Sequence, residues 1–201
     1  MYSVPRRTVL AAAATVLAAR VTKAQPASGP TIIVSGTKLL NNNQEYRAIG
    51  CNFYDALHHD DMAQRFTFLK ANGIPFIRLD FGVYSVGNAS DQGWRQYLTD
   101  KRAWYALRDR CVEAAEASNL GLVATMFWHP YTLPRLMEYA YGKEESLADW
   151  GRPESNTRHF MRDVVAEIAE RYKNSPSIWG WECGNEFSNE VILGCNQPVR
   201  Y

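Results

Sequence analysis

Four side chains that could bind a polyhydroxylated ligand and move a proton each lie in, or directly after, an apolar stretch of this sequence. Arg78 lies within IPFIRLDF, His129 follows GLVATMFW, and Asn185 and Glu186 end SIWGWECGNE. A cation, an imidazole, an amide and a carboxyl group can together hold hydroxyl groups and transfer a proton. Glu186 is the strongest candidate for that transfer. The alternative is a solvated glutamate at the start of a loop.

Neighbouring residues define the setting expected for this chemistry. Trp179 and Trp181 precede Glu186 in an apolar run, and they are expected to help desolvate its carboxyl group, which favours the proton-donating form. Glu182 shares the strand parity of Glu186, so it should point the same way, deeper in the sheet. Because a buried carboxylate needs a partner, we expect Glu182 to be structural and to pair with Arg78, which could also contact ligand.

The elements that must position these residues show two hydrophobic periods. Apolar, β-rich runs between turn residues predict strands, and apolar residues at helical spacing predict helices. Strands are expected at residues 32–34 and 38–40, as a hairpin, and at 47–52, 74–81, 121–128 and 177–186. Helices are expected over 60–73, 100–119 and 155–174, with Asp60 or Asp61 and Ser155 or Asn156 as N-caps. Their predicted buried stripes are Met62, Phe66, Phe68 and Leu69; Trp104, Leu107, Cys111 and Ala114; and Phe160, Val164, Ile168 and Tyr172.

This order of elements predicts an α/β fold with a parallel sheet. Strands that alternate with amphipathic helices are joined by right-handed crossovers, which place the helices over the sheet. In such folds function gathers where the strands end. The residues that follow the expected strands would therefore meet, together with Arg78, at the carboxyl end of the sheet, called the mouth below. These residues are Tyr54, Trp128 with His129, and Glu186.

Composition narrows the class of protein. The 201 residues suit one domain, 46% of them are hydrophobic, and the formal net charge is +1. That balance favours neither a nucleic-acid nor an anionic-membrane partner. The four cysteines show no C-x-x-C spacing, and their pairing is left open. Cys51 and Cys183 lie in apolar runs and are expected to pack as small hydrophobic side chains.

The first residues are read as a targeting segment and not as part of the fold. Arg6-Arg7 precede an apolar run from Val9 to Ala19, and Thr22-Lys23-Ala24 is a plausible cleavage site. The paired arginines and the alanine-rich core predict a twin-arginine signal peptide over residues 1–24, followed by a linker over 25–30. The mature chain is then expected to be secreted or periplasmic. The alternative is an uncleaved membrane anchor, which the shortness of the apolar run disfavours.

One segment of the sequence contains residue types that could bind a metal ion. LHHDD, at residues 57–61, contains possible metal ligands, but helix capping by an aspartate explains it better because no second ligand cluster has suitable spacing. The sequence contains neither a glycine-rich phosphate loop nor a G-x-S-x-G elbow. A doubly wound cofactor-binding domain is therefore disfavoured.

The motifs taken together resemble a known family. RAIGCNFYDA, IPFIRLD, MFWHP and WECGNEF are similar, in this order, to the first four strands of clan A glycoside hydrolases, particularly glycoside hydrolase family 5. The resemblance runs from Ile32 to Glu186. It implies a (β/α)8 TIM barrel, here truncated to about the first four βα units and preceded by a β-hairpin. It also implies Glu186 as acid/base, with Asn185, His129, Arg78 and Trp128 binding substrate.

The same resemblance implies a retaining mechanism on a β-linked polysaccharide or oligosaccharide, such as β-mannan or β-glucan. It also implies that the chemistry needs no metal and no organic cofactor. Retention requires a second carboxylate as nucleophile. In the family that residue lies on the seventh strand, beyond the part that this chain resembles. We therefore expect the N-terminal half of a catalytic barrel, which on its own would not hydrolyse glycosides. The alternative from another functional class is a non-catalytic carbohydrate-binding half-barrel.

Overall fold

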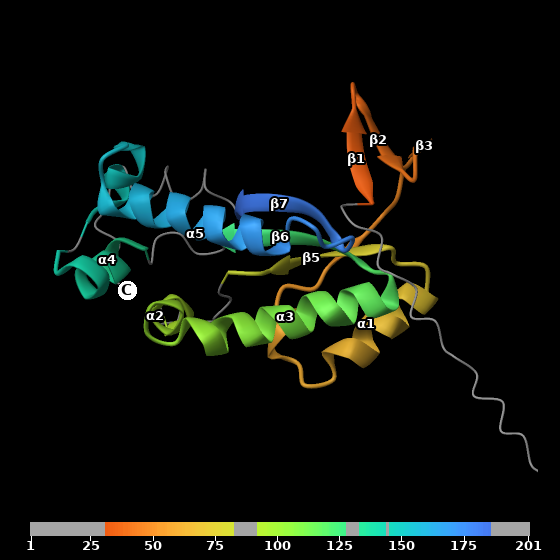
Figure 1. The fold of residues 1–201 in the computed structure, drawn as a ribbon, viewed down its shortest axis with the longest axis horizontal. Coiled ribbons are helices and arrows are strands. Elements are labelled where there is room, and N and C mark those ends of the chain that lie inside the picture. Colours follow the sequence, from red (N-terminus) through yellow and green to blue (C-terminus); the bar gives the residue numbers. More distant parts are fainter. Residues whose placement is uncertain (1–30, 83–91, 128–132, 144, 186–201) are drawn as a thin grey trace, which may run out of the picture.

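The computed structural model describes residues 31–82, 92–127, 133–143 and 145–185 (Figure 1). The proposed signal peptide and linker, and three expected site residues, Trp128, His129 and Glu186, lie outside these ranges. Cys195 lies outside them as well. The structure therefore tests the scaffold of the predicted mouth and two of its five expected site residues, Arg78 and Asn185.

The described elements follow the predicted order, with additions. In chain order they are β1 (Ile32–Ser35), β2 (Lys38–Asn41), β3 (Gln44–Glu45), β4 (Cys51–Asn52), η1 (Ala56–His58), α1 (Met62–Ala71), β5 (Phe76–Asp80), α2 (Gln92–Thr99), α3 (Lys101–Ser118), β6 (Gly121–Phe127), α4 (Leu133–Tyr141), η3 (Leu147–Gly151), α5 (Asn156–Tyr172) and β7 (Ile178–Gly184). Figure 1 shows a small sheet, β1–β3, that stands out from a body of parallel strands and helices.

The N-terminal hairpin is confirmed, but the strand predicted after it is mostly absent. β1 and β2 pair antiparallel, and β3 adds a third strand to their sheet. Of the strand predicted over residues 47–52, only Cys51 and Asn52 pair, with β5. The residues before them cross from one sheet to the other, and Ile49 is left 84% exposed. A β-rich sequence cannot form a ladder where its neighbours belong to two different sheets.

The main sheet is parallel, in the order β4-β5-β6-β7. Its register places Arg78 beside Val123, and Thr125 beside Glu182. Because side chains alternate along a strand, Arg78, Thr125 and Glu182 lie on one face of the sheet. The other face carries Ile77, Leu79, Leu122 and Ala124, all fully buried. The polar face is the one that matters for the site.

Helices cover the apolar face, and their buried stripes test the predicted ones. The stripe of α5 is confirmed: Phe160, Val164, Ile168 and Tyr172 are all buried. In α3 the stripe is rotated by about one residue. Trp104 and Cys111 are buried as predicted, but Ala115 is buried where Ala114 was expected. In α1 the prediction for Phe68 is wrong, since 66% of it is exposed. Phe66 is fully buried, and residues two positions apart on a helix, such as Phe66 and Phe68, lie on different faces of it.

Two helices were not predicted, α2 and α4. The eight residues of α2 are too few to be stable as an isolated helix, so the helix depends on packing. Trp94 of α2 stacks on Trp104 of α3 with ring centroids 5.8 Å apart, and it lies 5.4 Å from Phe127 and 5.7 Å from Phe160. These aromatic contacts join α2, α3, α5 and the end of β6 into one core.

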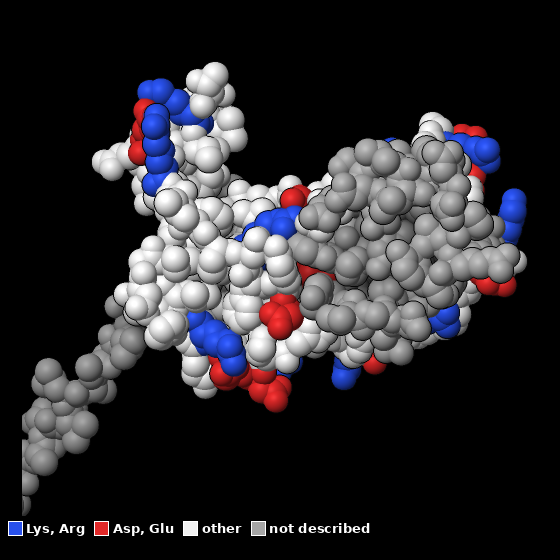
Figure 2. Space-filling model, turned by 180° about the vertical axis from the view of Figure 1, so that it is seen from behind, with Lys and Arg blue, Asp and Glu red and all other residues white. Residues whose placement is uncertain are grey.

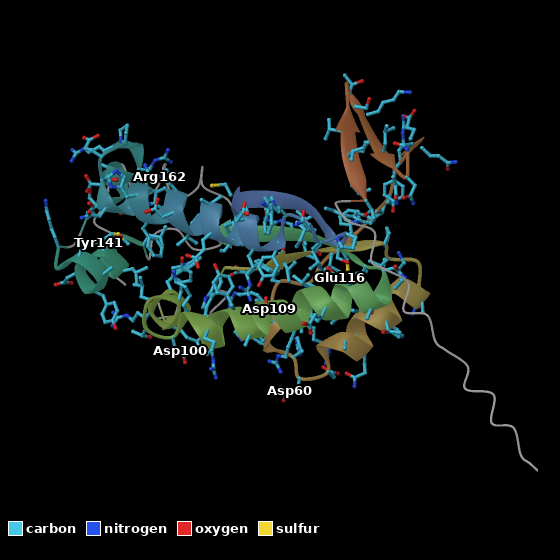
Figure 3. The ribbon with its side chains drawn as sticks, viewed as in Figure 1. Asp60, Asp100, Asp109, Glu116, Tyr141 and Arg162 are labelled. Carbon is cyan, nitrogen blue, oxygen red and sulfur yellow. The ribbon has the colours of Figure 1, made fainter. Side chains whose placement is uncertain are left out.

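The surface of the described residues carries charges of both signs. Figure 2 shows lysine and arginine side chains interspersed with aspartate and glutamate on the visible face. Figure 3 labels Asp109 on α3, whose carboxylate accepts hydrogen bonds from Arg171 and Tyr172 of α5. Among the described helices, none has the length and apolar character needed to cross a membrane.

Candidate functional site

Arg78 pairs with Glu182, as the sequence predicted. Arg78 Nε donates to Glu182 Oε2 over 2.7 Å, from the middle of β5 to the second half of β7. The two side chains are 22% and 32% exposed. Partial burial by itself would raise the pKa of Glu182, but the hydrogen bonds from Arg78 and Thr125 and the charge of Arg78 outweigh it. The pKa of Glu182 therefore lies below its usual range, and the pair is ionised at neutral pH.

Thr125, on the strand between them, completes this group. Its hydroxyl donates to the same Glu182 oxygen over 2.5 Å, and the residue is fully buried. Sequence reasoning missed Thr125. The available signal was its place as the one hydroxyl in the apolar run GLVATMF, because a buried hydroxyl needs a hydrogen-bond partner. Three adjacent strands thus contribute to one hydrogen-bonded cluster.

Asn185 lies directly after β7 and joins the cluster through Arg78. Arg78 Nη2 donates to Asn185 Oδ1 over 3.0 Å. The guanidinium group also lies 5.8 Å from the centre of the Tyr54 ring, which follows β4. Side chains from the ends of β4 and β7 therefore meet over Arg78, as the parallel topology predicted for the mouth.

A buried arginine outside the mouth organises the end of β5. The guanidinium of Arg108, on α3, donates to the backbone carbonyls of Phe81 and Trp104 and to that of Gly82. It also lies over the Trp104 ring, 3.4 Å from its centre. Burial lowers the pKa of Arg108 to about 9, and the charge of Asp80 opposes this shift. The side chain is thus cationic at neutral pH and holds the backbone where β5 leaves the sheet.

The same turn depends on a glycine for steric reasons. The amides of Phe81 and Gly82 both donate to the Thr125 carbonyl, over 2.9 and 3.1 Å. This contact brings Gly82 so close to β6 that a Cβ there would lie 1.8 Å from the Met126 carbonyl oxygen. The backbone around Arg78 and Thr125 is therefore set by close approach of main chains, and a larger residue at position 82 would displace it.

Three expectations about the surroundings of the site were wrong. Trp179 does not lie near the mouth: at the start of β7, its ring contacts Tyr46 and Phe76, with centroids 5.6 and 5.8 Å away. Trp181 packs against Phe81 on the helix-covered face. Cys183 is exposed and not packed as a small hydrophobic side chain, whereas Cys51 is half-buried against the core. Strand parity explains Trp181 and Cys183, which alternate with Glu182 along β7. It does not explain Trp179, because a register shift opposite Leu122 and Val123 interrupts the alternation, and the Trp179 ring lies over Gly121 and Phe76 at the start of the sheet.

The LHHDD segment shows no metal site. Within the described residues, no group of three or more histidine, cysteine, aspartate or glutamate side chains could hold a metal ion. Asp61 occupies the N-cap position of α1, as predicted, but its side chain makes no capping hydrogen bond. It accepts instead from Arg65 over 2.6 Å. The predicted cap of α5 is confirmed, since the Ser155 side chain accepts from the Arg158 amide.

Comparisons with known proteins match this chain to a family model and to a relative. A family model described as Cellulase (glycosyl hydrolase family 5) matches residues 27–194. A mannan endo-1,4-beta-mannosidase A from Hypocrea jecorina is 26% identical over 203 aligned residues, which cover 94% of this chain and 45% of that protein. The chain thus spans less than half the length of this relative.

Solved structures share the fold. The endo-1,4-beta-mannanase from Rhizomucor miehei matches with a TM-score of 0.53 and 15% identity, covering 77% of this chain and 48% of that one. A family 5 glycoside hydrolase from Bacteroides vulgatus matches with a TM-score of 0.51 and 17% identity, covering 78% and 33%. The four parallel strands with their helices therefore correspond to part of a TIM barrel.

Proposed function

Because the chain belongs to glycosyl hydrolase family 5, we propose that it is the N-terminal half of the catalytic barrel of a retaining glycoside hydrolase. Its substrate is a β-linked polysaccharide. The observation that carries the proposal is the hydrogen bond from Arg78 Nη2 to Asn185 Oδ1 at the carboxyl end of the sheet. Asn185 directly precedes Glu186, so this bond supports a place for the acid/base at the same mouth.

In this proposal each expected site residue has its own role in binding or catalysis. Arg78 and Asn185 hold sugar hydroxyl groups, Trp128 offers an aromatic face to a sugar ring, and His129 adds a hydrogen-bonding imidazole. Glu186 protonates the glycosidic oxygen as the bond to the anomeric carbon breaks. A carboxylate about 5–5.5 Å away attacks that carbon, and water then releases the sugar with Glu186 acting as base.

The attacking carboxylate would come from the half of the barrel that this chain does not span. Every step uses carboxyl groups and water, so the proposed chemistry needs no cofactor. Of the two substrate candidates, β-mannan is favoured by the mannanases among the relatives. β-Glucan is the second candidate because the matching family model is described as Cellulase.

A hybrid barrel tests the acid/base assignment. This chain would be joined to the later half of the Rhizomucor miehei mannanase, and folding checked by circular dichroism. We expect hydrolysis of β-mannan or a β-glucan, and a fall in kcat of about 100-fold or more for Glu186→Gln, because general acid catalysis supplies about that much.

The exposed Glu113 on α3 provides the matched control, and Glu113→Gln should leave activity unchanged. Equal hydrolysis by the wild-type hybrid and Glu186→Gln would show that the assignment is wrong. Sugar binding without hydrolysis, unaffected by Glu186→Gln, would instead support a non-catalytic carbohydrate-binding half-barrel.

Export is a separate part of the proposal. We propose that residues 1–24 direct the chain through the twin-arginine pathway to the periplasm or the medium. Changing both Arg6 and Arg7 to lysine should stop export of the chain, measured by fractionation in a bacterial host with that pathway. The matched control is Arg20→Lys, which keeps the pair. Normal export of the double variant would exclude the twin-arginine interpretation.

A further inference from the structure

One carboxylate oxygen lies at the centre of the described site. Glu182 Oε2 accepts from Arg78 Nε over 2.7 Å and from Thr125 Oγ1 over 2.5 Å. These donors come from the two strands that precede β7 in the sheet, β5 and β6. Two donors on one oxygen restrain the carboxylate more than either would alone. Glu182 therefore presents a fixed acceptor to the guanidinium of Arg78.

That acceptor determines how Arg78 is oriented. A guanidinium is planar, so a hydrogen bond to Nε restrains the direction of its two terminal nitrogens as well. One of them, Nη2, donates to Asn185 Oδ1 over 3.0 Å. The position of Glu182 within the sheet therefore restrains, through Arg78, the position of the Asn185 side chain just beyond the end of β7.

The chemistry of Arg78 also determines which way the Asn185 amide faces. A guanidinium group donates hydrogen bonds and cannot accept them. The Asn185 atom beside it must therefore be the amide oxygen, and the NH2 group is turned away from Arg78. With the opposite orientation, two donor groups would face each other.

From these contacts we propose that Thr125 and Glu182 are positioning residues, which act through Arg78 to aim the Asn185 NH2 group at a hydroxyl of the bound sugar. The contact with the sugar rests on the proposed function. The hydrogen-bonded chain from Thr125 and Glu182 through Arg78 to Asn185, called the relay below, rests on the hydrogen bonds. The presence of threonine at position 125 supports this role. A valine would fill the same buried space and would leave no hydroxyl group that needs a hydrogen-bond partner. The threonine hydroxyl is used only toward the Glu182 carboxylate among the side-chain contacts described for it.

Nuclear magnetic resonance on the full 201-residue chain tests the relay without any activity. The readouts are the Arg78 Nε–H signal and the Asn185 side-chain NH2 signals, assigned by their loss in Arg78→Lys and Asn185→Asp. Thr125→Val and Glu182→Gln should each shift both sets of signals. Thr125→Ser, which keeps the hydroxyl, should return them toward their wild-type positions.

Thr67→Val is the matched control, since it removes a threonine hydroxyl on the exposed part of α1. It should leave both sets of signals in place. Glu182→Gln provides the answer if Thr125→Val does not fold. Asn185 signals that stay fixed while those of Arg78 move would overturn the relay.

The hybrid barrel tests the part that concerns sugar. Thr125→Val should raise KM for a mannan oligosaccharide about five- to tenfold, the effect of one misdirected hydrogen bond, with a smaller change in kcat. Thr125→Ser should restore KM. An unchanged KM alongside shifted signals would overturn the role in sugar binding. A hybrid whose hydrolysis is indifferent to Glu186→Gln would refute the proposed function and leave the relay to be decided by the signals alone.

Discussion

Two clusters in this molecule use the same chemical groups for different ends. The mouth cluster (Arg78, Thr125, Glu182 and Asn185) and the helix cluster (Asp109, Arg171 and Tyr172) each hold a carboxylate between an arginine and a hydroxyl. In the helix cluster, Arg171 donates to both Asp109 oxygens, over 2.9 and 2.6 Å, so both of these hydrogen bonds go to the same carboxylate. In the mouth cluster Arg78 donates one hydrogen bond to the Glu182 carboxylate and another to a different residue, Asn185.

Position in the fold explains the difference. The helix cluster joins α3 to α5 on the outer layer, and its hydrogen bonds serve packing. The mouth cluster lies on the polar face of the sheet, where parallel strands end and ligands bind in such folds. The same carboxylate–arginine pair can therefore stabilise a helix interface or orient a binding group. The comparison predicts that helix-cluster variants affect stability alone.

The largest expected effect is at the backbone that supports the mouth. Gly82→Ala should lower the free energy of unfolding by about 3 kcal/mol, because the added methyl group overlaps the Met126 carbonyl. Urea unfolding followed by circular dichroism measures it. Gly180→Ala, where a Cβ meets nothing within 4 Å, is the control and should change stability by less than about 0.5 kcal/mol. Equal losses in the two variants would mean that the mouth is not set by this close approach.

A smaller effect is expected in the helix cluster. Asp109→Asn should cost about 1 kcal/mol, because the pair with Arg171 is partly exposed and screened by solvent. It should not move the Arg78 or Asn185 resonances. Asp163→Asn is the control, since its pair with Arg162 is more than two-thirds exposed on both sides. Movement of the Arg78 signal in Asp109→Asn would show that the two clusters are coupled.

The pH dependence of that effect follows from the pKa of Asp109. The hydrogen bond from Arg171 is the main cause that holds this pKa below its usual value. The stabilisation is therefore fully present above the unfolded-state pKa of about 3.9 and is lost as the pH falls through the lower folded-state value. The difference in stability between wild type and Asp109→Asn should shrink below about pH 4. A difference that grows on acidification would contradict this account.

The smallest effect concerns a carboxylate that is held without a cation. Glu145 accepts from the backbone amides of Asn156 and Thr157, over 2.8 Å each, and from the Thr157 hydroxyl over 2.7 Å. Glu145→Gln should cost about 0.5–1 kcal/mol, since the anion also interacts with the N-terminus of α5. Thermal unfolding measures the change. Glu154→Gln, at an exposed position before the same helix, is the control, and an equal loss there would exclude specific capping.

Prediction from sequence was most successful where the pattern is local. The alternation of strands and helices and the stripe of α5 follow from hydrophobic periods that can be read within one segment. The pairing of Arg78 with Glu182 was also predicted, because an isolated ionised side chain in a sheet needs a counter-charge. The assignments of Glu186, His129 and Trp128 stay predictions, since those residues lie outside the described part of the chain.

Prediction failed where a position depends on partners distant in the sequence. The α2 helix exists because Trp94 packs against Trp104, and eight residues alone do not show this. Trp179 was expected near the mouth. It is the second residue of β7, so it lies at the opposite end of the sheet. The direction along a strand was available from sequence, whereas the contacts with Tyr46 and Phe76 were not.

The sequence by itself determined the alternation of β5, β6 and β7 with α1, α3 and α5, because apolar residues repeat every two positions in strands and every 3.6 in helices. It also showed which polar residues lie in or directly after the strands. Only the tertiary structure decided the register that sets Thr125 beside Glu182, and the close approach that requires glycine at position 82. Register is a relation between segments more than fifty residues apart along the chain. It is selected by the packing of the whole sheet against its helices, and no local pattern contains it.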